Sequence, residues 1–315
     1  MERVNAITDV RGVQVGHAQD EEALTGCTVI LCRRGAVAGV DVRGGAPGTR
    51  ETNLLDPVNV VEKIHGVVLA GGSAFGLDAA SGVMRYLEEQ KIGFDTGTAK
   101  IPIVPSAILY DLSVGRNDVR PDATMGYRAA VAASSAAPAE GNVGAGMGAS
   151  VGKMRGMKYA MKSGVGTWSM KINGLVIGAL VAVNAIGDVV DPNSGELIAG
   201  MRSGTTLGFL KKKPPRAAVT SNTVIGVVAT DAKLTKAQAT KVAQMAHDGL
   251  ARVIRPAHTM FDGDTIFAMA TGQKKADVSM VGAFAAEVMA EAILRAVKMA
   301  APAGGLPGLS KTKRG

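Results

Sequence analysis

Residues 223–229 are Thr-Val-Ile-Gly-Val-Val-Ala, an apolar and β-branched run that predicts a strand buried on both faces. Next, the capping box Thr235-Lys236-Ala237-Gln238 opens a helix predicted to run to about Ile254. A strand from Asp264 to Ala270 and a long helix from Val278 to Met299 follow. Two strands and two helices cannot bury both faces of a two-stranded sheet, so this part must complete a sheet begun earlier. The pattern predicts one intertwined α/β domain.

The earlier part of the chain supplies further strands. Cys27–Cys32 and Ala36–Arg43 are strand-like runs. Residues 33–35, Arg-Arg-Gly, lie between them and are predicted to form the turn of a hairpin. His65–Leu69 predicts a buried strand, and a helix is predicted from about Leu77 to Gln90.

Turn and loop signals follow in the middle and at the end of the chain. Asn173-Gly174 is a strong hairpin signal between strand-like segments that extend from Gly164 to Val190. The Lys- and Pro-rich stretch from Lys211 to Arg216 is predicted to be a loop, and the tail from Ala301 onward is predicted to be a flexible end.

The composition limits the class of protein. The 315 residues include 41 Gly and 47% hydrophobic but only 3% aromatic residues, which suits a globular domain. No stretch approaches the ~20 apolar residues of a membrane helix, and the first residues lack a signal peptide's apolar segment, so we expect a cytoplasmic protein without membrane association. The net charge of +8 suggests nucleic acid, but aromatic side chains for base stacking are scarce and no helix-turn-helix or zinc spacing is present. No nucleic-acid partner is therefore expected.

Cysteine and histidine chemistry is also limited. Cys27 and Cys32 lie five positions apart in a predicted strand, so their side chains point to opposite faces and neither pair nor bind metal. The four histidines are dispersed with no i,i+4 pair, which argues against a histidine metal site and a Ser-His-Asp triad. A hydrolase with this sequence needs another base, and a Thr whose base is its own α-amine meets that need.

Polar residues at the ends of apolar runs are candidate site residues. Thr223, preceded by Asn222, opens the buried strand. Asp262 and Asp264 alternate at the start of the next strand, and Asn184 closes an apolar run. Taken singly, each also has a structural interpretation as a turn residue or a solvated carboxylate.

Taken together, these signals match one family. From Val4 through Met299 the chain resembles the DmpA-type N-terminal-nucleophile peptidases and amidases, which include DmpA aminopeptidase, β-peptidyl aminopeptidases and the nylon-oligomer hydrolase NylC. Eight blocks match in order, and such an ordered set is highly specific. The blocks are Asn5–Val10, Asp41–Gly45, Leu69–Leu77, Val104–Asp111, Gly144–Lys153, Val183–Asp188, Asn222-Thr223 and His258–Thr265.

The resemblance implies a fold and a processing step. A DmpA-like α/β fold has two β-sheets sandwiched between helices, here in a single domain of residues 1–315. Thr223 matches the family's nucleophile, and the bond between Asn222 and Thr223 matches the one cut autocatalytically. The products would be an α chain of residues 1–222 and a β chain of residues 223–315. The resemblance further implies no metal or organic cofactor, and a homo-oligomer that is a tetramer of α/β heterodimers.

Five further residues match positions in or near the family's active site. They are Tyr110, Lys153, Asn184, Asp262 and Asp264. The resemblance implies that Asn184 and Lys153 donate to the oxyanion. It also implies that the two aspartates orient Lys153 and the new ammonium, and that Tyr110 passes a proton to the leaving amine.

The chemistry suits these residue types. A free α-amine has a pKa of about 7.7–8, so near neutral pH it can take the proton of the Thr223 hydroxyl. Before processing that nitrogen is an amide, so the hydroxyl must attack the Asn222 carbonyl to give an ester that water opens. Two adjacent carboxylates repel unless a cation lies between them, and Lys153 and the Thr223 ammonium are the candidates.

The substrate class stays open between two alternatives. Cleavage of small peptides or amides from an amino terminus and endo-hydrolysis of linear 6-aminohexanoate oligomers both fit, and the Asp-Gly-Asp pattern at 262–264 is more similar to the NylC branch. An ornithine-acetyltransferase-like acyl transferase is a further alternative, whose Ala-Thr-Met processing site differs from the Asn-Thr-Val of residues 222–224. An unprocessed, non-enzymatic scaffold of the same fold would run as one band on a denaturing gel.

Overall fold

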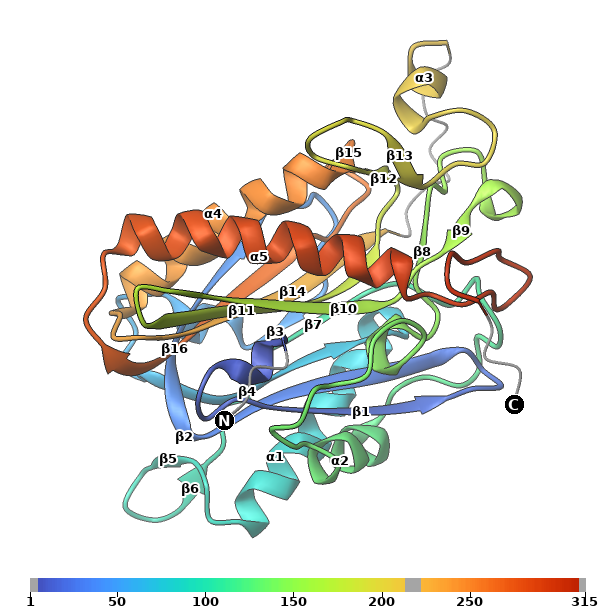
Figure 1. Ribbon diagram of the computed structural model, residues 1–315. Helices are drawn as coiled ribbons and strands as arrows, with labels where there is room; N and C mark the ends of the chain where they lie inside the picture. The colour runs from blue at the N-terminus through green and yellow to red at the C-terminus, as the bar shows by residue number, and fades with distance from the viewer. Residues whose placement is uncertain (1–4, 213–221, 312–315) are drawn as a thin grey trace.

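The computed structural model describes residues 5–212 and 222–311, and a nine-stranded sheet runs through it (Figure 1). The strands of this sheet are β1 (Gln14–Asp20), β2 (Thr25–Val42), β3 (Thr49–Arg50), β4 (Lys63–Ala70), β7 (Ser106–Ile108), β10 (Val165–Ile172), β11 (Leu175–Asn184), β14 (Thr223–Ala232) and β16 (Thr265–Lys274). Their order is β10-β11-β14-β16-β2-β4-β7-β3, with β1 also paired to β2. Two pairs, β14 with β16 and β4 with β7, are parallel.

The described part of the chain also contains five α-helices and three small strand groups. The helices are α1 (Ala79–Glu89), α2 (Ala123–Val131), α3 (Thr206–Leu210), α4 (Lys236–Val253) and α5 (Val278–Lys298). The small groups are β5 (Phe94–Asp95) with β6 (Lys100–Ile101), β8 (Ser150–Val151) with β9 (Met161–Lys162), and β12 (Asp188–Val190) with β13 (Leu197–Ala199) and β15 (Ile254–Arg255). Among the residues described, none of the helices has the length and apolarity needed to span a membrane.

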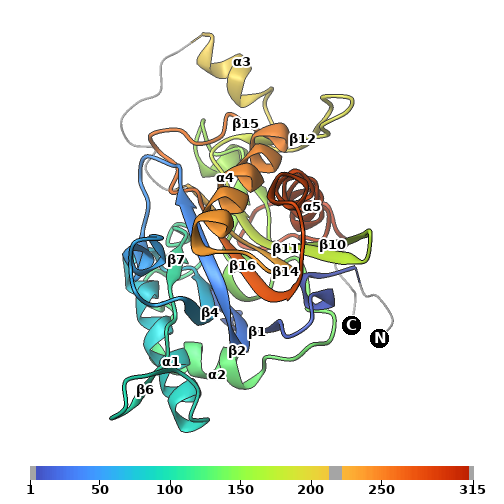
Figure 2. The same cartoon turned by 90° about the vertical axis from the view of Figure 1, so that its left-hand side faces the viewer.

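The sheet forms two layers, because β2 is 18 residues long and belongs to both. Residues 25–31 of β2 pair with β1, whereas residues 37–42 pair with β16. One layer, which includes β10, β11, β14 and β16, is covered by α4 and α5, and the other, with β1 and β4, is covered by α1 and α2 (Figures 1 and 2). The predicted arrangement of two sheet layers between helices is confirmed, with β2 joining the layers.

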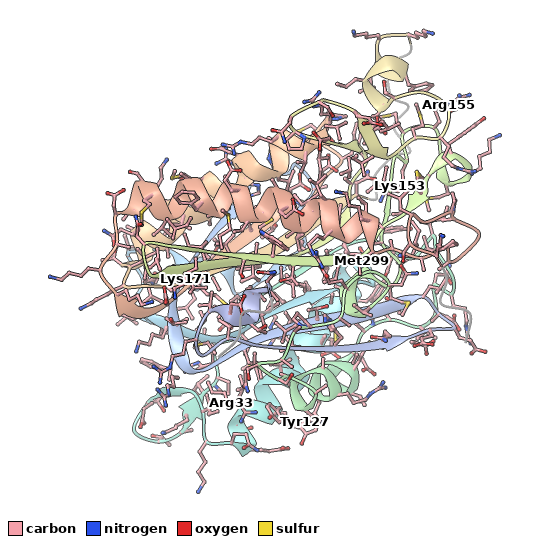
Figure 3. All side chains as sticks on the ribbon, viewed as in Figure 1. Arg33, Tyr127, Lys153, Arg155, Lys171 and Met299 are labelled. Atoms are coloured by element: carbon pink, nitrogen blue, oxygen red, sulfur yellow. The ribbon has the colours of Figure 1, made fainter. Side chains whose placement is uncertain are left out.

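Apolar side chains fill the space on both faces of the central strands (Figure 3). In β14, Val224 and Val228 pack in the cluster under α4 and α5, while Ile225 and Val227 pack between the two sheet layers. Both faces of β14 are therefore buried, which explains the continuous apolar run at 223–229.

Local turn and cap signals predicted from the sequence are confirmed. The side chain of Thr235 accepts from the Gln238 amide and that of Gln238 from the Thr235 amide, which is the predicted capping box at the start of α4. Asn173 and Gly174 both have positive φ, at 49° and 80°, and join β10 to β11 in an antiparallel hairpin. Cys27 and Cys32 are buried, free, and packed in different clusters.

The predicted hairpin at residues 33–35 is wrong. Leu31 pairs with Gly66 and Ala36 pairs with Ile64, so four residues of β2 lie opposite one residue of β4. This is a large bulge within one continuous strand, and Gly35, with a φ of 73°, occupies the left-handed conformation that the bulge requires.

The predicted flexible tail is also wrong for residues 301–310. Leu306 is buried against Val114 and Ala160, and the carbonyl of Pro307 accepts a hydrogen bond from the Lys162 amide at 2.8 Å. Gly304 and the following glycine, at φ 57° and 74°, form the turn that places Leu306. Of the predicted Lys- and Pro-rich loop at 211–216, residues from 213 onward lie outside the described ranges.

Candidate active site

Several strand ends meet at one end of the large sheet. β11 and β14 are antiparallel, so the last residue of β11, Asn184, pairs with the first residue of β14, Thr223. β14 and β16 are parallel, so the residues that precede these strands also lie side by side, and Asn222 pairs with Asp262. Val42, the last residue of β2, pairs with the first residue of β16. The topology therefore gathers candidate residues that are far apart in the sequence.

The Thr223 hydroxyl lies against the peptide group that precedes it. Its Oγ donates a hydrogen bond to the carbonyl oxygen of Asn222, and the Gly263 amide donates to the same oxygen at 3.0 Å. A β-carbon at position 263 would lie 2.9 Å from Thr223 Oγ and 2.6 Å from the Ala46 carbonyl oxygen, so glycine is needed there. The hydroxyl therefore lies next to the Asn222 carbonyl group, and the Gly263 amide occupies the place of a donor that would stabilise an oxyanion formed there.

The side chains of Lys153 and Asn184 and the backbone of Tyr110 lie in contact. Lys153 follows β8 and Gly152, whose φ of 72° turns the chain inward. Its Nζ donates to the Asn184 side-chain oxygen at 2.7 Å and to the Asn184 carbonyl oxygen at 2.9 Å. Asn184 Oδ1 also accepts the Ser150 amide at 3.1 Å, while its Nδ2 donates to the Tyr110 carbonyl oxygen at 2.9 Å. Donors and an acceptor on several segments therefore hold the Asn184 amide in one orientation, beside Thr223.

Burial makes Lys153 a weaker base than an ordinary lysine. Its side chain is buried, whereas Arg155, two residues further on, is exposed (Figure 3). Burial lowers the pKa of Lys153 from 10.5 to about 7, with the negative charges of Asp262 and Asp111 opposing the shift. Near neutral pH this amine can therefore both lose and accept a proton.

This pKa predicts a specific pH dependence of stability. Between pH ~7 and ~10 the unfolded chain binds the Lys153 proton and the folded chain does not, so the free energy of unfolding rises with pH over this range. Below pH ~7 both states bind the proton, and this group changes the stability no further. Lys153→Met removes the contribution of this group to the pH dependence of the stability. Urea unfolding of both proteins, each carrying Thr223→Ala to exclude the predicted cleavage, should show wild-type Lys153 gaining stability over Met as pH rises. Curves that stay parallel would contradict the prediction.

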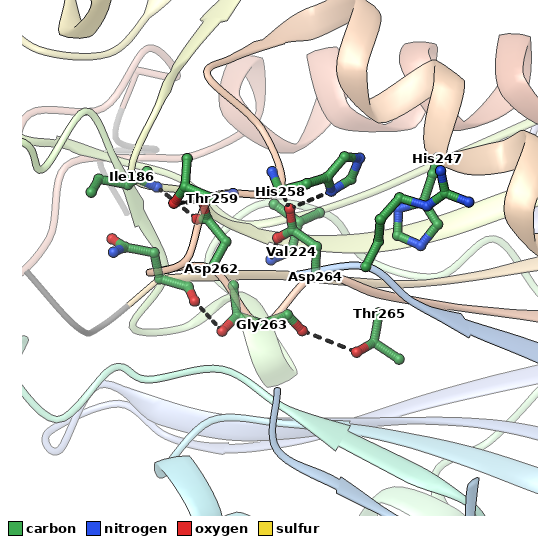
Figure 4. A network of polar contacts seen from close by, with 12 residues as sticks. Ile186, Val224, His247, His258, Thr259, Asp262, Gly263, Asp264 and Thr265 are labelled. Carbon is green, nitrogen blue, oxygen red and sulfur yellow. Dashed lines mark hydrogen bonds and ion pairs between the residues drawn. The ribbon is translucent and has the colours of Figure 1, made fainter. Parts of the chain in front are cut away.

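Asp262 is held by the loop that precedes it. Its Oδ2 accepts the Thr259 amide at 3.0 Å and the Thr259 hydroxyl at 2.5 Å, and its Oδ1 faces the Ile186 amide at 3.4 Å (Figure 4). Burial, and next the charge of Asp264, raise the pKa of Asp262 to about 6. The charge of Asp262 in turn favours protonated Lys153.

Asp264 makes a second set of contacts. Its Oδ1 accepts the Val224 amide at 2.8 Å, and its Oδ2 accepts both the amide and the ring Nδ1 of His258, at 3.0 Å and 2.8 Å. Donors from separate segments thus hold the two carboxylates in the unprocessed chain, and the prediction of a cation between them stays a prediction.

Further buried polar groups, which were not predicted from the sequence, surround these residues. Asp111 accepts the Gly72 amide at 2.7 Å and the Thr25 hydroxyl at 2.8 Å, and burial raises its pKa. Lys162 is fully buried and donates to carbonyl groups of the segment that leads to Lys153. Asp111 follows Tyr110 directly in a matched block, which is a signal that was present. Lys162 has no such signal, because its partners are carbonyl groups that only folding brings to it.

His258 and Thr259 also contact the two carboxylates, and neither is predicted from the sequence as a site residue. Thr259 stands three positions before Asp262, a spacing typical of a side chain that caps a turn. His258 has no histidine partner at metal-binding spacing, so its spacing indicates no role. Among residues 5–212 and 222–311, no group of three or more His, Cys, Asp and Glu side chains is placed to hold a metal ion.

Known proteins resemble this chain over nearly its whole length. Residues 5–310 match the model of peptidase family S58. The chain is 45% identical to an uncharacterized aminopeptidase of Mycobacterium leprae, over 96% of this chain and 93% of that protein. It is 32% identical to the 6-aminohexanoate-oligomer endohydrolase of Kocuria sp., over 92% of this chain and 85% of that protein.

A solved structure shares the fold. The L-aminopeptidase D-Ala-esterase/amidase of Ochrobactrum anthropi, described as a variant of the Ntn-hydrolase fold, superposes with a TM-score of 0.72 at 21% identity, over 94% of this chain and 86% of that one. This likeness concerns the fold alone. The family match confirms the resemblance found in the eight sequence blocks and favours a hydrolase over an acyl transferase. The chain belongs to peptidase family S58, the DmpA family, and is a peptide or amide hydrolase.

Proposed function

We propose that the chain cuts itself between Asn222 and Thr223 and then uses Thr223 as the N-terminal nucleophile of an amide hydrolase. The contact that supports this most directly is the hydrogen bond from the Thr223 hydroxyl to the Asn222 carbonyl oxygen, which also accepts the Gly263 amide. The nucleophile, the bond to be cut and an oxyanion donor are thus together before any cleavage.

Processing follows from this arrangement as an acyl shift. The Thr223 oxygen bonds to the Asn222 carbonyl carbon while its proton is taken up, and the Gly263 amide stabilises the oxyanion. The bond from that carbon to the Thr223 nitrogen then breaks as that nitrogen receives the proton taken from the hydroxyl, which leaves an ester and a free α-amine. Water hydrolyses the ester and releases the Asn222 carboxylate. Lys153, with a pKa of about 7, has an unprotonated fraction near neutral pH that suits it to take up the first proton.

Turnover reuses the same hydroxyl. The new α-amine of Thr223 takes the hydroxyl proton, and the hydroxyl attacks the substrate amide to form an acyl ester that water opens. We assign Asn184 and Lys153 to the oxyanion, because Lys153 holds the Asn184 amide beside Thr223. Removing one such donor typically raises the barrier by roughly 3–4 kcal/mol. Asp262 and Asp264 orient Lys153 and the ammonium form of Thr223, and the Tyr110 hydroxyl is proposed to protonate the leaving amine.

The processing step is tested by intact mass. Purified protein should contain a fragment that begins Thr223-Val224-Ile225 and a second that ends at Asn222. A chain that stays whole and yet hydrolyses amides at full rate would overturn the mechanism.

The substrate is proposed to be a short peptide or a linear amide oligomer. The relatives include an aminopeptidase and a 6-aminohexanoate-oligomer endohydrolase, so both exo- and endo-cleavage have precedents. Matched oligoamides with a free and an acetylated amino terminus separate the two, with product masses as the readout. An aminopeptidase releases single units from the free terminus alone, whereas an endohydrolase cuts both substrates internally.

Activity of the processed enzyme should rise with pH. The Thr223 α-amine acts as base only when unprotonated, and an ordinary α-amine has a pKa of about 7.7–8. Asp262 adds a second loss toward acid, because with a pKa of about 6 it is neutral below that pH and no longer orients the Thr223 amine. Measured from about pH 5 to pH 9, kcat/KM should climb steadily, and a profile that falls over this range would exclude the amine as base.

We also infer, from the family resemblance, a tetramer of processed α/β heterodimers. Light scattering should then give about four times the 32.1 kDa mass of one chain. A mass of one chain at working concentration would contradict the inference.

A further inference from the structure

The loop before β16 holds the carboxylates of Asp262 and Asp264 by the same pattern of hydrogen bonds. Thr259 directs its amide and its hydroxyl at Oδ2 of Asp262. His258, one residue earlier, directs its amide at 3.0 Å and its ring Nδ1 at 2.8 Å toward Oδ2 of Asp264. Figure 4 shows the two pairs side by side. Consecutive loop residues thus each donate twice to one carboxylate oxygen.

Asp264 also binds the residue that follows the nucleophile. Its other oxygen, Oδ1, accepts the amide of Val224 at 2.8 Å, and Val224 is bonded to Thr223. The Asp264 side chain is 2% exposed, so water does not substitute for these donors. An ionised carboxylate only accepts hydrogen bonds, and therefore the proton on His258 must be at Nδ1.

The backbone and the surroundings fix the His258 ring. His258 has a φ of 54°, a left-handed conformation uncommon for a residue other than glycine, and in it both the amide and the ring reach the same oxygen. The ring of His247 packs edge-on against it, with centroids 4.8 Å apart and planes at 75°. His247 itself is anchored to Asp41 at the end of β2, through the Asp41 carbonyl at 3.1 Å and its carboxylate at 3.4 Å.

The packed histidine carries no charge near neutral pH. Burial lowers the pKa of His247 to about 4, so its ring is neutral near pH 7. The other charged groups here are Asp41 with its partner Arg43, at 2.7 Å, and the carboxylates of Asp262 and Asp264. His258 thus faces the negative charge of Asp264 on one side and the uncharged ring of His247 on the other. The negative charge of Asp264 favours an N–H donor at Nδ1.

We propose that His258 is a positioning residue of this hydrolase, which acts through Asp264 and the Val224 amide to hold the hydroxyl and α-nitrogen of Thr223 in their reactive direction. The proposal rests on the function proposed above. It assigns to a loop histidine a role that needs neither a metal nor transfer of the hydroxyl proton to the imidazole.

The test compares two substitutions of His258 in processed enzyme, with rates calculated per mole of β chain. His258→Ala removes the ring donor and should lower kcat roughly ten- to a hundredfold, as expected when one hydrogen bond to a charged group is lost, while KM changes little. His258→Asn should restore most of kcat, because asparagine tolerates positive φ and offers an Nδ2 donor at the position of Nδ1. His65→Asn, on β4 in the other layer, is the matched control and should keep wild-type kcat.

Each outcome has a defined meaning. An alanine variant with wild-type kcat, or an asparagine variant as slow as alanine, overturns the proposal. If the proposed function itself is wrong, Thr223→Ala will retain activity, a result that these His258 variants do not produce. A measurement on the wild-type protein covers the case of an unfolded variant: ¹⁵N NMR of the His258 ring should show a proton on Nδ1, and a neutral ring protonated on Nε2 overturns the proposal.

Discussion

Replacing Thr223 by alanine is expected to leave a whole, inactive chain of 315 residues. The substitution removes the oxygen that attacks the Asn222 carbonyl and the oxygen that attacks the substrate, which are the same atom. Loss of a hydrolase nucleophile typically lowers kcat on the order of 10⁶-fold. A denaturing gel should show one band, and amide hydrolysis should fall to the background rate.

Thr223→Ser is the matched control for that experiment. Serine keeps the hydroxyl and the α-nitrogen, so processing and turnover should persist at reduced rates, because the lost methyl group frees the rotamer of the nucleophile. An alanine variant that is cut at position 222, or that hydrolyses substrate, would remove Thr223 from the mechanism.

Asp264→Asn should produce the next largest effect, a loss of turnover of roughly 10²–10⁴-fold together with slow processing. An amide offers one acceptor and one donor, whereas Asp264 accepts on both oxygens. Whichever way the amide turns, its NH₂ group faces an N–H donor, either that of Val224 or those of His258. The negative charge that would face the Thr223 ammonium is lost as well.

Stability measured alongside separates this role from a structural one. The buried mismatch should lower the free energy of unfolding by roughly 1–3 kcal/mol, which leaves most of the protein folded. Asp248→Asn, at an exposed position of α4, should change neither property. An Asp264→Asn protein with near-normal turnover and reduced stability would make Asp264 a structural residue only.

Features that depend on neighbouring residues were predicted well from the sequence. The apolar run at 223–229 forms a strand that is buried on both faces. The capping box at Thr235 forms through a reciprocal pair of hydrogen bonds, and the Asn173-Gly174 turn forms through two positive φ angles. Observed boundaries differ by a few residues, as at β14, which continues to Ala232 because its pairing with β16 extends that far.

Two local predictions failed because distant pairing overrode them. Residues 33–35 have turn composition, but β4 on one side and β16 on the other keep β2 running in a single direction, so the extra residues form a bulge. The tail has the composition of a flexible end, yet Leu306 packs against Val114 and Ala160. No local sequence pattern predicts this contact.

In the candidate site, too, some features were predictable from the sequence and others depend on the tertiary structure. The sequence by itself determined the family and the candidate residues, since Thr223, Asn184 and the two aspartates stand at the ends of recognisable strands in ordered blocks. Only the tertiary structure decided their partners. Antiparallel pairing places Asn184 beside Thr223, and parallel pairing places Asp262 beside Asn222. Hydrogen bonds such as that of Asp264 with Val224, forty residues apart, exist only in this register. The chemistry of each side chain is local, but the acceptor or donor that it meets depends on which strand ends the fold brings together.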